Sequence, residues 1–430
     1  MKTEVYKFGG ASVKDAEGVM NASGIITAFS GGNLLVVISA MGKITNSLEK
    51  LLDARIYGED WKPLCNKIFR FHRDIIDALR VSNPRFSPSG YFQLEQDFAE
   101  ELLLDCSPEK YDRHYDRIVA YGELWSTAIV SEWVAASGLN PEWLDARDLV
   151  ITDETHRFAE VNWQATTQSC AQLAAQMEEV AVGPGKIVIT QGFIGRSLRG
   201  EPVTLGREGS DYSASVFAYV LDANAVTIWK DVPGMLNADP RWYPEAVKLS
   251  SISYREAIEL SYYGASVIHP KTVQPLQQKQ IPLYIKSFLC PEEQGTVIQA
   301  DDSNDHLVPS FIHKGNQWLI SLSSRSFSFI VESQLRQIFE ALGGIGMKIS
   351  LMQNSAISFT FCTDGDQRKF DLLTSSLGTE YHIRYNSGLE LLTIRHYNSR
   401  IIAELLQGRE ILLEQRSRST ARFVLRSEIN

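Results

Sequence analysis

Residues 34–46 read LLVVISAMGKITN, and this stretch indicates the fold class of the protein. The segment from Leu34 to Ser39 carries no charge and is rich in branched apolar residues, which is typical of a strand buried on both faces. Gly42 then predicts a turn, and a helix is expected to begin near Thr45. A buried strand that leads through a turn into a helix is the repeating unit of α/β proteins.

The same alternation of strand and helix continues on both sides of this stretch. Helices are predicted after Ser12, within the long charged segment 61–137, and over 161–180. Further strands are predicted at 4–8, 140–145, 186–195, 225–229 and 281–285. Strands separated by helices of this length need crossover connections, so we expect a mostly parallel sheet sandwiched by helices.

A polar stretch near residues 301–316, which begins DDSNDH, predicts a domain boundary. Beyond it the apolar segments predict the ferredoxin-like order βαββαβ, with members at 318–322, 333–342, 347–352, 356–361, 366–376 and 381–385. A shorter second copy follows, with strands predicted at 389–395, 410–414 and 421–425 around a helix at 399–406. This second copy lacks a final helix and strand.

The composition is that of an ordinary folded enzyme, with 44% hydrophobic residues, 22% charged residues and a net charge of −10. A broad nucleic-acid-binding surface usually carries the opposite charge. No apolar segment reaches the ~18 residues of a membrane helix, and the N-terminus lacks a secretory signal pattern. The cysteines show no CxxC pair and the histidines no HExxH spacing. We therefore expect a cytoplasmic protein without a zinc site, a nucleic-acid partner or a membrane partner.

The first candidate site follows the strand at 4–8. Lys7 stands at the end of this strand, and Gly9, Gly10 and Ser12 come next. Backbone N–H groups of such a turn can face a phosphate, with the lysine adding a point charge and the serine able to cap the next helix. The alternative is a tight turn without function, and the chain has neither GxxxxGK[ST] nor GxGxxG.

The second candidate site is GREGSD at 206–211. Arg207 suits a bidentate contact with a carboxylate or phosphate. The alternative is that Ser210 or Asp211 caps a helix and Arg207 is a surface charge.

Three more segments carry polar groups near expected strand ends or in helices. A loop with Pro-Gly and Asp-Pro turns runs over 229–241, where an open α/β sheet binds ligands. Tyr121-Gly122-Glu123 lies in a helix-rich segment, and hydroxyl groups stand at 39–46. Taken singly, each has an ordinary structural explanation.

Taken together, these motifs are specific. KFGGASV, SAMGKITN, YGE, TLGREGSDYSA, KDVPGMLNADPR and YYGASVIHP occur in this order, and the chain closely resembles the aspartokinases of the amino acid kinase family. The resemblance implies the amino acid kinase fold at 1–300 and paired ACT regulatory domains at 301–430. It implies a first ACT unit at 317–387 and a second built from 301–316 with 388–430. A chain ending at Asn430 has no room for a homoserine dehydrogenase domain, so we expect a monofunctional form.

The resemblance implies an aspartate kinase that uses MgATP to phosphorylate the β-carboxylate of L-aspartate, the first step of lysine, threonine and methionine biosynthesis. Lys7 would neutralise the transferred phosphoryl group and Asp211 would orient lysines. Substrate contacts would come from Ser39, Thr45, Glu123, Arg207 and Ser210. ATP contacts would come from Lys7, Gly9, Gly10, Ser12, Lys230, Asp231, Leu236, Arg241 and Ser266. A homodimer or larger assembly and an amino-acid effector at the ACT domains are also implied.

Four departures from the family pattern bear on these roles. The family commonly has a lysine in GAKVLHP, where this chain has Ser266, and Lys230 either relocates that charge or is a solvated strand end. Glu208 replaces a glycine and places a negative charge near an anion site, which is unfavourable unless it points away or meets Mg²⁺. Leu236 replaces an aromatic residue of the nucleotide loop. Ser350 and Ala356 stand where acidic residues would hold a lysine effector, so the effector is not identified.

Two other functions remain open at this point. The chain would be another amino acid kinase, acting on glutamate or acetylglutamate, if the ACT-like tail and the context of Glu123 were misleading. It would be a degenerate regulatory subunit if Ser266 and Glu208 had ended catalysis. The presence of Lys7, Arg207, Ser210 and Asp211 together favours an active kinase.

Overall fold

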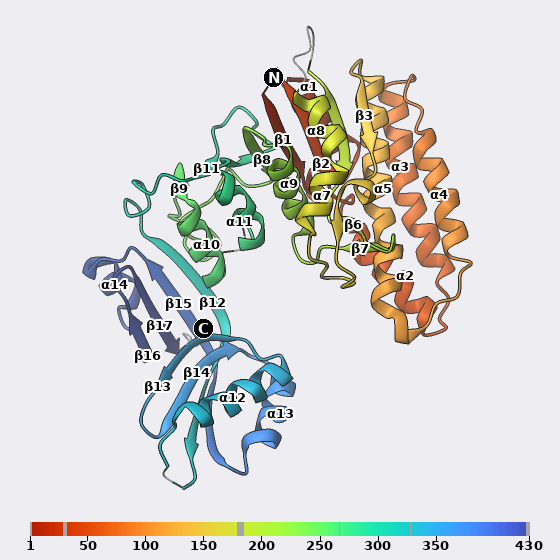
Figure 1. Cartoon of the computed structure of the whole chain (residues 1–430). Coiled ribbons are helices and arrows are strands. Elements are labelled where there is room, and N and C mark those ends of the chain that lie inside the picture. Colours follow the sequence, from red (N-terminus) through yellow and green to blue (C-terminus); the bar gives the residue numbers. More distant parts are fainter. Residues whose placement is uncertain (1, 29–31, 179–184, 266, 327, 427–430) are drawn as a thin grey trace. The chain divides into compact units, whose positions relative to one another are not determined.

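The chain forms two compact units in the computed structural model, which describes residues 2–28, 32–178, 185–265, 267–326 and 328–426 (Figure 1). The first unit holds residues 1–235, 248–258 and 267–302, and the second holds 236–247, 259–266 and 303–430. Two short segments therefore leave the first unit and join the second well before the polar stretch at 301–316. Within the described residues, every helix falls short of the length and apolarity that crossing a membrane requires.

An eight-stranded sheet forms the centre of the first unit, in the order β3-β5-β2-β1-β8-β10-β11-β9. All neighbours run parallel except β10 and β11, which confirms the expected mostly parallel sheet. The strands are β1 (Thr3–Phe8), β2 (Asn33–Ile38), β3 (Pro141–Leu144), β5 (Ile187–Gln191), β8 (Ala225–Lys230), β9 (Ser251–Ser253), β10 (Leu283–Ser287) and β11 (Thr296–Gln299).

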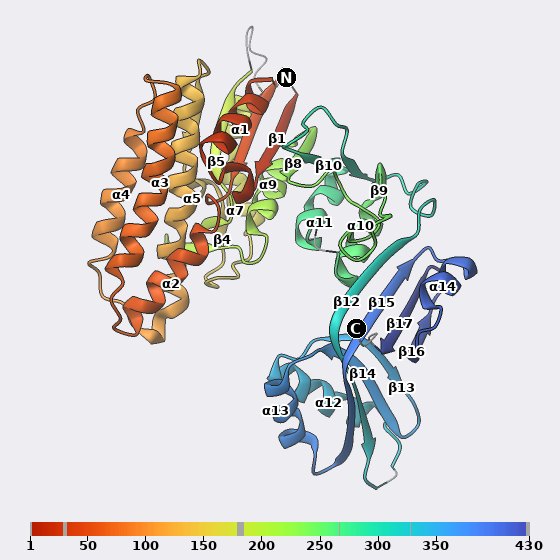
Figure 2. The same ribbon diagram turned by 180° about the vertical axis from the view of Figure 1, so that it is seen from behind.

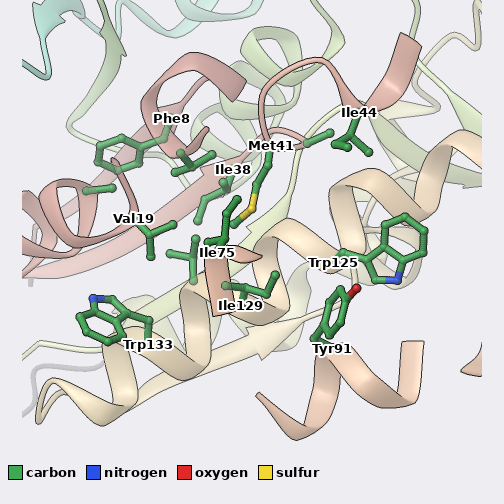
Figure 3. Packing of buried hydrophobic residues seen from close by; sticks show 14 of the residues in the cluster. Phe8, Val19, Ile38, Met41, Ile44, Ile75, Tyr91, Trp125, Ile129 and Trp133 are labelled. Atoms are coloured by element: carbon green, nitrogen blue, oxygen red, sulfur yellow. The ribbon is translucent and has the colours of Figure 1, made fainter. Parts of the chain in front are cut away.

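Helices cover both faces of this sheet (Figure 2). On one face, alternate residues of β2, Leu34, Val36 and Ile38, join a core with residues of α1, α2, α3, α4 and α5. Trp125 and Ile129 of α5 belong to this core together with Met41 and Ile75 (Figure 3). The helices are α1 (Ala16–Ala28), α2 (Ile44–Ile56), α3 (Lys62–Ser82), α4 (Ser89–Glu101) and α5 (Tyr111–Ala136).

The opposite face of the sheet is covered by other helices. Leu35 and Val37 alternate with the residues above and therefore point to this second face, where α9 packs against β1, β2 and β8. α11 packs in turn on α9. The helices outside the first core are α6 (Ala146–Leu149), α7 (Trp163–Ser169), α8 (Ala171–Glu178), α9 (Gly209–Val220), α10 (Tyr254–Tyr263) and α11 (Pro270–Lys279), and two 3-10 turns are η1 (Gly10–Val13) and η2 (Pro108–Lys110).

Two predicted elements of the first unit are divided in the structure. The helix expected over 161–180 is two helices, α7 and α8, which meet at Cys170, and its last two residues lie outside the described residues. The strand expected over 186–195 ends at Gln191, because Phe193 has a φ of 68° and turns the chain. The chain then enters a separate three-stranded sheet of β4 (Ile151–Thr152), β6 (Ile194–Ser197) and β7 (Pro202–Thr204).

The second unit is one antiparallel sheet in the order β13-β14-β12-β15-β17-β16. Its two central strands are longer than predicted, since β12 begins at Ser310 and β15 joins two strands expected to be separate. The elements are β12 (Ser310–Ser324), α12 (Glu332–Ile345), β13 (Ile349–Asn354), β14 (Ser358–Asp364), α13 (Gln367–Leu377), β15 (Tyr381–Arg395), α14 (Ser399–Leu406), β16 (Ile411–Arg416) and β17 (Thr420–Arg426). The two βαβ copies therefore share β12 and β15 and form a continuous sheet.

The shared strands explain how the shorter second copy is completed. Residues 310–314 of β12 pair with 391–395 of β15, so chain that precedes the first copy supplies the outer strand of the second. Segment 236–247 covers the sheet next to α14. In it, Trp242 stacks on His313 with ring centroids 4.9 Å apart, and Ala238 joins a core with Phe311 and Phe423.

Candidate active site

A cavity of about 340 Å³ opens at the carboxyl ends of β1, β2 and β8, where ligands bind in open α/β sheets. Lys7 lies near the end of β1, Ser39 directly follows β2, and Lys230 ends β8. The full lining is Lys7, Gly10, Ser39, Ala40, Gly42, Thr45, Glu123, Phe193, Gly206, Glu208, Gly209, Ser210, Asp211 and Lys230. Five separate motifs of the sequence thus meet in one place.

Two lysines share one carboxylate in this cavity. The Lys7 ammonium lies 2.5 Å from Oδ1 of Asp211, and the Lys230 ammonium lies 3.2 Å from Oδ2. Burial by itself raises the pKa of Asp211, but the two ammonium groups outweigh this effect and hold the pKa below its ordinary value. Asp211 is therefore an ionised group that positions two cations.

The geometry decides between the two readings of Lys230. Its side chain is 22% exposed, and its ammonium donates to the carbonyl of Val267 as well as facing Asp211. A solvated strand end would have neither contact, so that alternative is wrong. Whether Lys230 replaces the charge of another lysine is a separate question, because Ser266 lies outside the described residues.

Glu123 reaches the cavity from α5. Glu123 is 3% exposed, and this burial raises the pKa of its carboxyl group to about 8. A hydrogen bond from the N–H of Ala40 and the charge of Lys7 lower the pKa, but by less. Its Oε2 has no hydrogen-bond partner among the described residues. The unpartnered Oε2 and the raised pKa indicate that the Glu123 carboxyl group is protonated near pH 7. A cationic ligand beside it would stabilise its ionised form.

The loop before α9 places Glu208 in an unusual conformation. Its φ is 54°, in the left-handed region that favours glycine, and its Oε2 is buried without a hydrogen-bond partner among the described residues. Of the two possibilities for Glu208, pointing away from the anion site or meeting Mg²⁺, its place in the cavity lining argues against the first. Arg207 beside it is exposed and is not part of the lining, whereas Ser210 is buried at the start of α9 and is part of it.

The glycine loop after β1 approaches another backbone closely. A Cβ added at Gly10 would lie 2.5 Å from the carbonyl oxygen of Ala40, and the N–H of Gly42 donates to the Gly10 carbonyl. Ser12 is buried and its hydroxyl donates to the carbonyl of Trp229 at 3.4 Å. It does not cap the next helix, because Asp15 accepts the N–H of Gly18 there instead.

The remaining candidates are not brought to the cavity lining. Asp231 is exposed after the end of β8. Leu236 and Arg241 belong to the second unit, and the Arg241 guanidinium pairs with Asp239 at 2.6 Å. Sequence reasoning missed Phe193, which lines the cavity; the signal available was the Gln-Gly-Phe turn within the strand expected at 186–195.

Comparison with known proteins agrees with this arrangement. The amino acid kinase family matches residues 2–287. The lysine-sensitive aspartokinase 3 of Escherichia coli (strain K12) is 33% identical over 401 residues, which cover 91% of this chain and 86% of that protein. A chloroplastic bifunctional aspartokinase/homoserine dehydrogenase 2 of Arabidopsis thaliana is 27% identical over 396 residues, and the match spans 89% of this chain but only 42% of that longer protein.

Solved structures give the same result. E. coli aspartokinase III in complex with lysine and aspartate has a TM-score of 0.80 and 27% identity, covering 99% of this chain and 96% of that one. The same enzyme with aspartate and ADP has a TM-score of 0.78 and 26% identity, again covering 99% and 96%. The chain belongs to the amino acid kinase family and, within it, to the aspartokinases.

Proposed function

We propose that this protein is an aspartate kinase, which transfers the γ-phosphoryl group of ATP to the β-carboxylate of L-aspartate and forms 4-phospho-L-aspartate. The observation that carries the proposal is the placement of the Lys7 and Lys230 ammonium groups on Asp211, in the cavity that Glu123 also lines. The similar E. coli enzyme has been solved with aspartate and with ADP, which supports both substrates. The reaction would be the first step towards lysine, threonine and methionine.

The chemistry of the acceptor explains why the cavity needs cations more than a base. A carboxylic acid with a pKa of ~4 is already ionised at pH 7, so its oxygen attacks without losing a proton. The barrier comes from alignment and from repulsion between the carboxylate and the triphosphate. Lys7 and Lys230 reduce this repulsion, and Asp211 holds them in place.

The substrate amino acid would be held by its two ends. Arg207 would bind the α-carboxylate, and its exposure at the rim leaves the guanidinium available for a ligand. Glu123 would bind the α-ammonium, which would draw the buried carboxyl into its ionised form. Hydroxyl groups of Ser39, Thr45 and Ser210 would complete the contacts.

The nucleotide phosphates would lie along the backbone of Gly9 and Gly10, close to Lys7 and Lys230, with Asp231 at the loop edge. Ser12, Leu236, Arg241 and Ser266 stay predictions as nucleotide contacts. Mg²⁺ usually takes one or two protein carboxylates and completes its shell with phosphates and water. The unpartnered Oε2 of Glu208 in this cavity fits such a role. The ion would neutralise phosphate charge when bound.

Assembly and regulation are proposed for the second unit. Phe329, Val331 and Ile357 are 68%, 45% and 43% exposed, and the N–H of Ile330 donates to the carbonyl of Ala356, so the two segments are adjacent and we infer that these apolar side chains share one patch. A contiguous exposed apolar patch is typical of an interface, and we infer a homodimer or larger assembly through it. The ACT-like sheets would bind an amino-acid effector whose identity the side chains do not specify.

A coupled assay of ADP release tests the proposed function directly. The purified protein is supplied with MgATP and L-aspartate, and separately with L-glutamate, N-acetyl-L-glutamate or no acceptor. Turnover with aspartate well above the other acceptors supports the proposal. Preference for a glutamate acceptor would make the protein another amino acid kinase. Absence of turnover with every acceptor, from a folded protein that still binds an amino acid, would make it a regulatory subunit.

A further inference from the structure

The sheet of the second unit curls until its two edge strands meet. β13 and β16 lie at opposite ends of the strand order, yet the side-chain amide of Gln415 in β16 donates to the Met352 carbonyl in β13 at 3.4 Å. Apolar side chains fill the inside of this curl, among them Leu351, Leu391 and Val424. The curled sheet therefore has an inner face with an open end.

A cavity of about 480 Å³ occupies that open end. Part of its wall is apolar, from Phe339, Leu351 and Met352, and part is polar, from Ser350, Ser417 and Thr420. Tyr262 and Tyr263 at the end of α10 also line it. Its size is within the range of pockets that enclose small organic ligands.

Two arginines line this cavity, and of these Arg416 pairs with Glu414 whereas Arg422 of β17 is buried. The residue is 8% exposed, its Nε donates to Thr393 at 3.4 Å, and its guanidinium carbon lies 4.9 Å from the ring centre of Tyr263. No carboxylate of the described residues forms an ion pair with it. Burial lowers the pKa of Arg422, although an arginine remains charged at neutral pH.

Two neighbouring buried arginines differ from Arg422, because each of them has a carboxylate partner. Arg395 pairs with Glu259 at 3.6 Å, and Arg409 pairs with Glu390, although both arginine side chains are also about nine-tenths buried. A buried charge without a partner is costly, so proteins normally supply a carboxylate, as they do at these two positions. At Arg422 the guanidinium instead faces a cavity.

We propose that this cavity binds a small organic carboxylate with an apolar body, through a bidentate contact with Arg422. The forked guanidinium matches a carboxylate in geometry and charge. The apolar wall formed by Leu351 and Met352 would receive the body of the ligand. No acidic residue lines the cavity, so the site has no carboxylate to pair with an ammonium group and disfavours a zwitterionic amino acid. The site lies entirely in the second unit and does not depend on the proposed kinase activity.

Benzoate is a suitable probe, because it combines a carboxylate with a flat apolar ring. Binding to the full chain is measured by saturation-transfer NMR and by the rise in melting temperature with benzoate concentration. We expect a dissociation constant of about 1 mM or tighter. Benzamide, which is neutral, and benzylamine, which is cationic, should bind at least about tenfold more weakly. Equal binding of all three, or no binding of benzoate, would overturn the proposal.

Variants locate the binding site. Arg422→Met keeps the length and removes the charge, and should weaken benzoate binding at least about tenfold. Arg418→Met is the matched control, because Arg418 is an exposed arginine of the same hairpin that does not line the cavity. Lys7→Ala should leave benzoate binding unchanged, since Lys7 belongs to the cavity of the first unit. Unchanged binding in Arg422→Met would overturn the proposal.

A second variant serves if Arg422→Met fails to fold. Met352 is 48% exposed and lines the same cavity, so Met352→Trp fills the space from the rim without disturbing the core. This variant should melt like the wild type and lose the benzoate-dependent rise in melting temperature. Full retention of that rise would place benzoate elsewhere and refute the assignment.

Discussion

The ammonium group of Lys230 lies 3.2 Å from the carboxylate of Asp211. Since Lys7 approaches the other oxygen of the same carboxylate, Asp211 fixes the separation of two cations rather than neutralising one. The aspartokinase pattern places a lysine in the segment that here contains Ser266. The pairing with Asp211 gives the chain a second ammonium group in the cavity from a different loop, which makes Lys230 the most informative residue to substitute.

Lys230→Ala should lose most of the kinase activity, because a cation near developing phosphate charge contributes a few kcal/mol, or ~100-fold in rate. The measurement is kcat in the coupled ADP assay. Lys230→Thr combined with Ser266→Lys should recover part of the activity if the position of the charge matters more than its loop. Wild-type turnover in Lys230→Ala would end the idea that this lysine replaces another.

Lys7→Ala should abolish turnover while the protein remains folded, since Lys7 would carry the charge closest to the transferred group. We expect a loss of ~100-fold or more in kcat. Lys14→Ala is the control, because Lys14 is an exposed lysine after the same glycine loop. Because both lysines contact Asp211, the effects of Lys7→Ala and Lys230→Ala should be non-additive in the double variant. Strict additivity would show that the two cations act on separate groups.

Aspartate binding should release close to one proton at pH 7. Burial raises the pKa of Glu123 to about 8, so the unliganded carboxyl holds a proton, and an ammonium ion bound beside it would expel that proton. Calorimetry in two buffers of different ionisation enthalpy measures the proton count. Glu123→Gln should release none. Glu123→Gln and Arg207→Ala should weaken aspartate binding by roughly 2–5 kcal/mol while ATP affinity changes little. An equal loss of ATP affinity would refute their assignment.

Glu123 should also make stability depend on pH. Its folded-state pKa of about 8 lies above the ordinary value of 4.5, so the folded protein binds more protons than the unfolded chain between these values. The contribution to stability is complete below about pH 4.5 and is lost as the pH rises through 8. The free energy of unfolding of the wild type, measured with urea, should therefore fall over this pH interval relative to that of Glu123→Gln. A pH-independent difference between the two proteins would contradict the raised pKa.

Glu208→Gly should show whether Glu208 affects only the stability of the fold or also the Mg²⁺ requirement of the kinase activity. Glycine adopts a φ of 54° without strain, so the free energy of unfolding should rise by up to about 1 kcal/mol. If Glu208 helps to hold Mg²⁺, the concentration of Mg²⁺ needed for half-maximal activity should increase several-fold. A more stable variant with an unchanged Mg²⁺ requirement would remove Glu208 from the metal site and leave only a strained turn.

Phe329→Asp should dissociate the proposed dimer. The substitution places a charge in the exposed patch with Val331 and Ile357, and desolvating that charge opposes association. Sedimentation velocity of the full chain measures the effect, and Tyr57→Asp, which alters an exposed residue of the first unit, is the control. A dimeric Phe329→Asp protein would move the interface elsewhere. Removing all residues after Asp302 is less clean, because Trp242 would lose its contact with His313.

The parallel sheet of the first unit could be predicted because each buried strand is a short apolar segment with its own turn. Periodicity did not reveal the break at Phe193, since the residues on both sides are equally suited to a strand and only its φ of 68° divides them. The continuity of β15 was missed because its sequence contains residues that are typical of a turn. Asn386, Ser387 and Gly388 suggest a turn, but the structure has only an irregularity of the strand there. Gly388 has a φ of 65° and the register shifts, yet both Asn386 and Leu389 pair with β12, so the strand continues.

The candidate site was predictable where a motif stood at the carboxyl end of a strand, as Lys7, Ser39 and Lys230 do. The shared contact of two lysines with Asp211 was not, because it depends on how far each side chain reaches across the cavity. The role of Ser12 was misjudged, because a serine after a glycine turn suits a helix cap equally well. Its hydroxyl instead donates a hydrogen bond to the carbonyl of Trp229.

The strands shared by both halves of the second sheet impose an order on folding during synthesis. Residues 310–314 emerge from the ribosome long before residues 391–395, with which they pair, and those pair in turn with β17 at the end of the chain. Ala238 and Trp242 also stay unpacked during this time, because Phe311 and Phe423, with which they form a core, belong to these strands. Translation thus leaves an unpaired strand edge and apolar surface exposed until the last strand is made. A premature stop before Thr420 would damage segments made almost two hundred residues earlier.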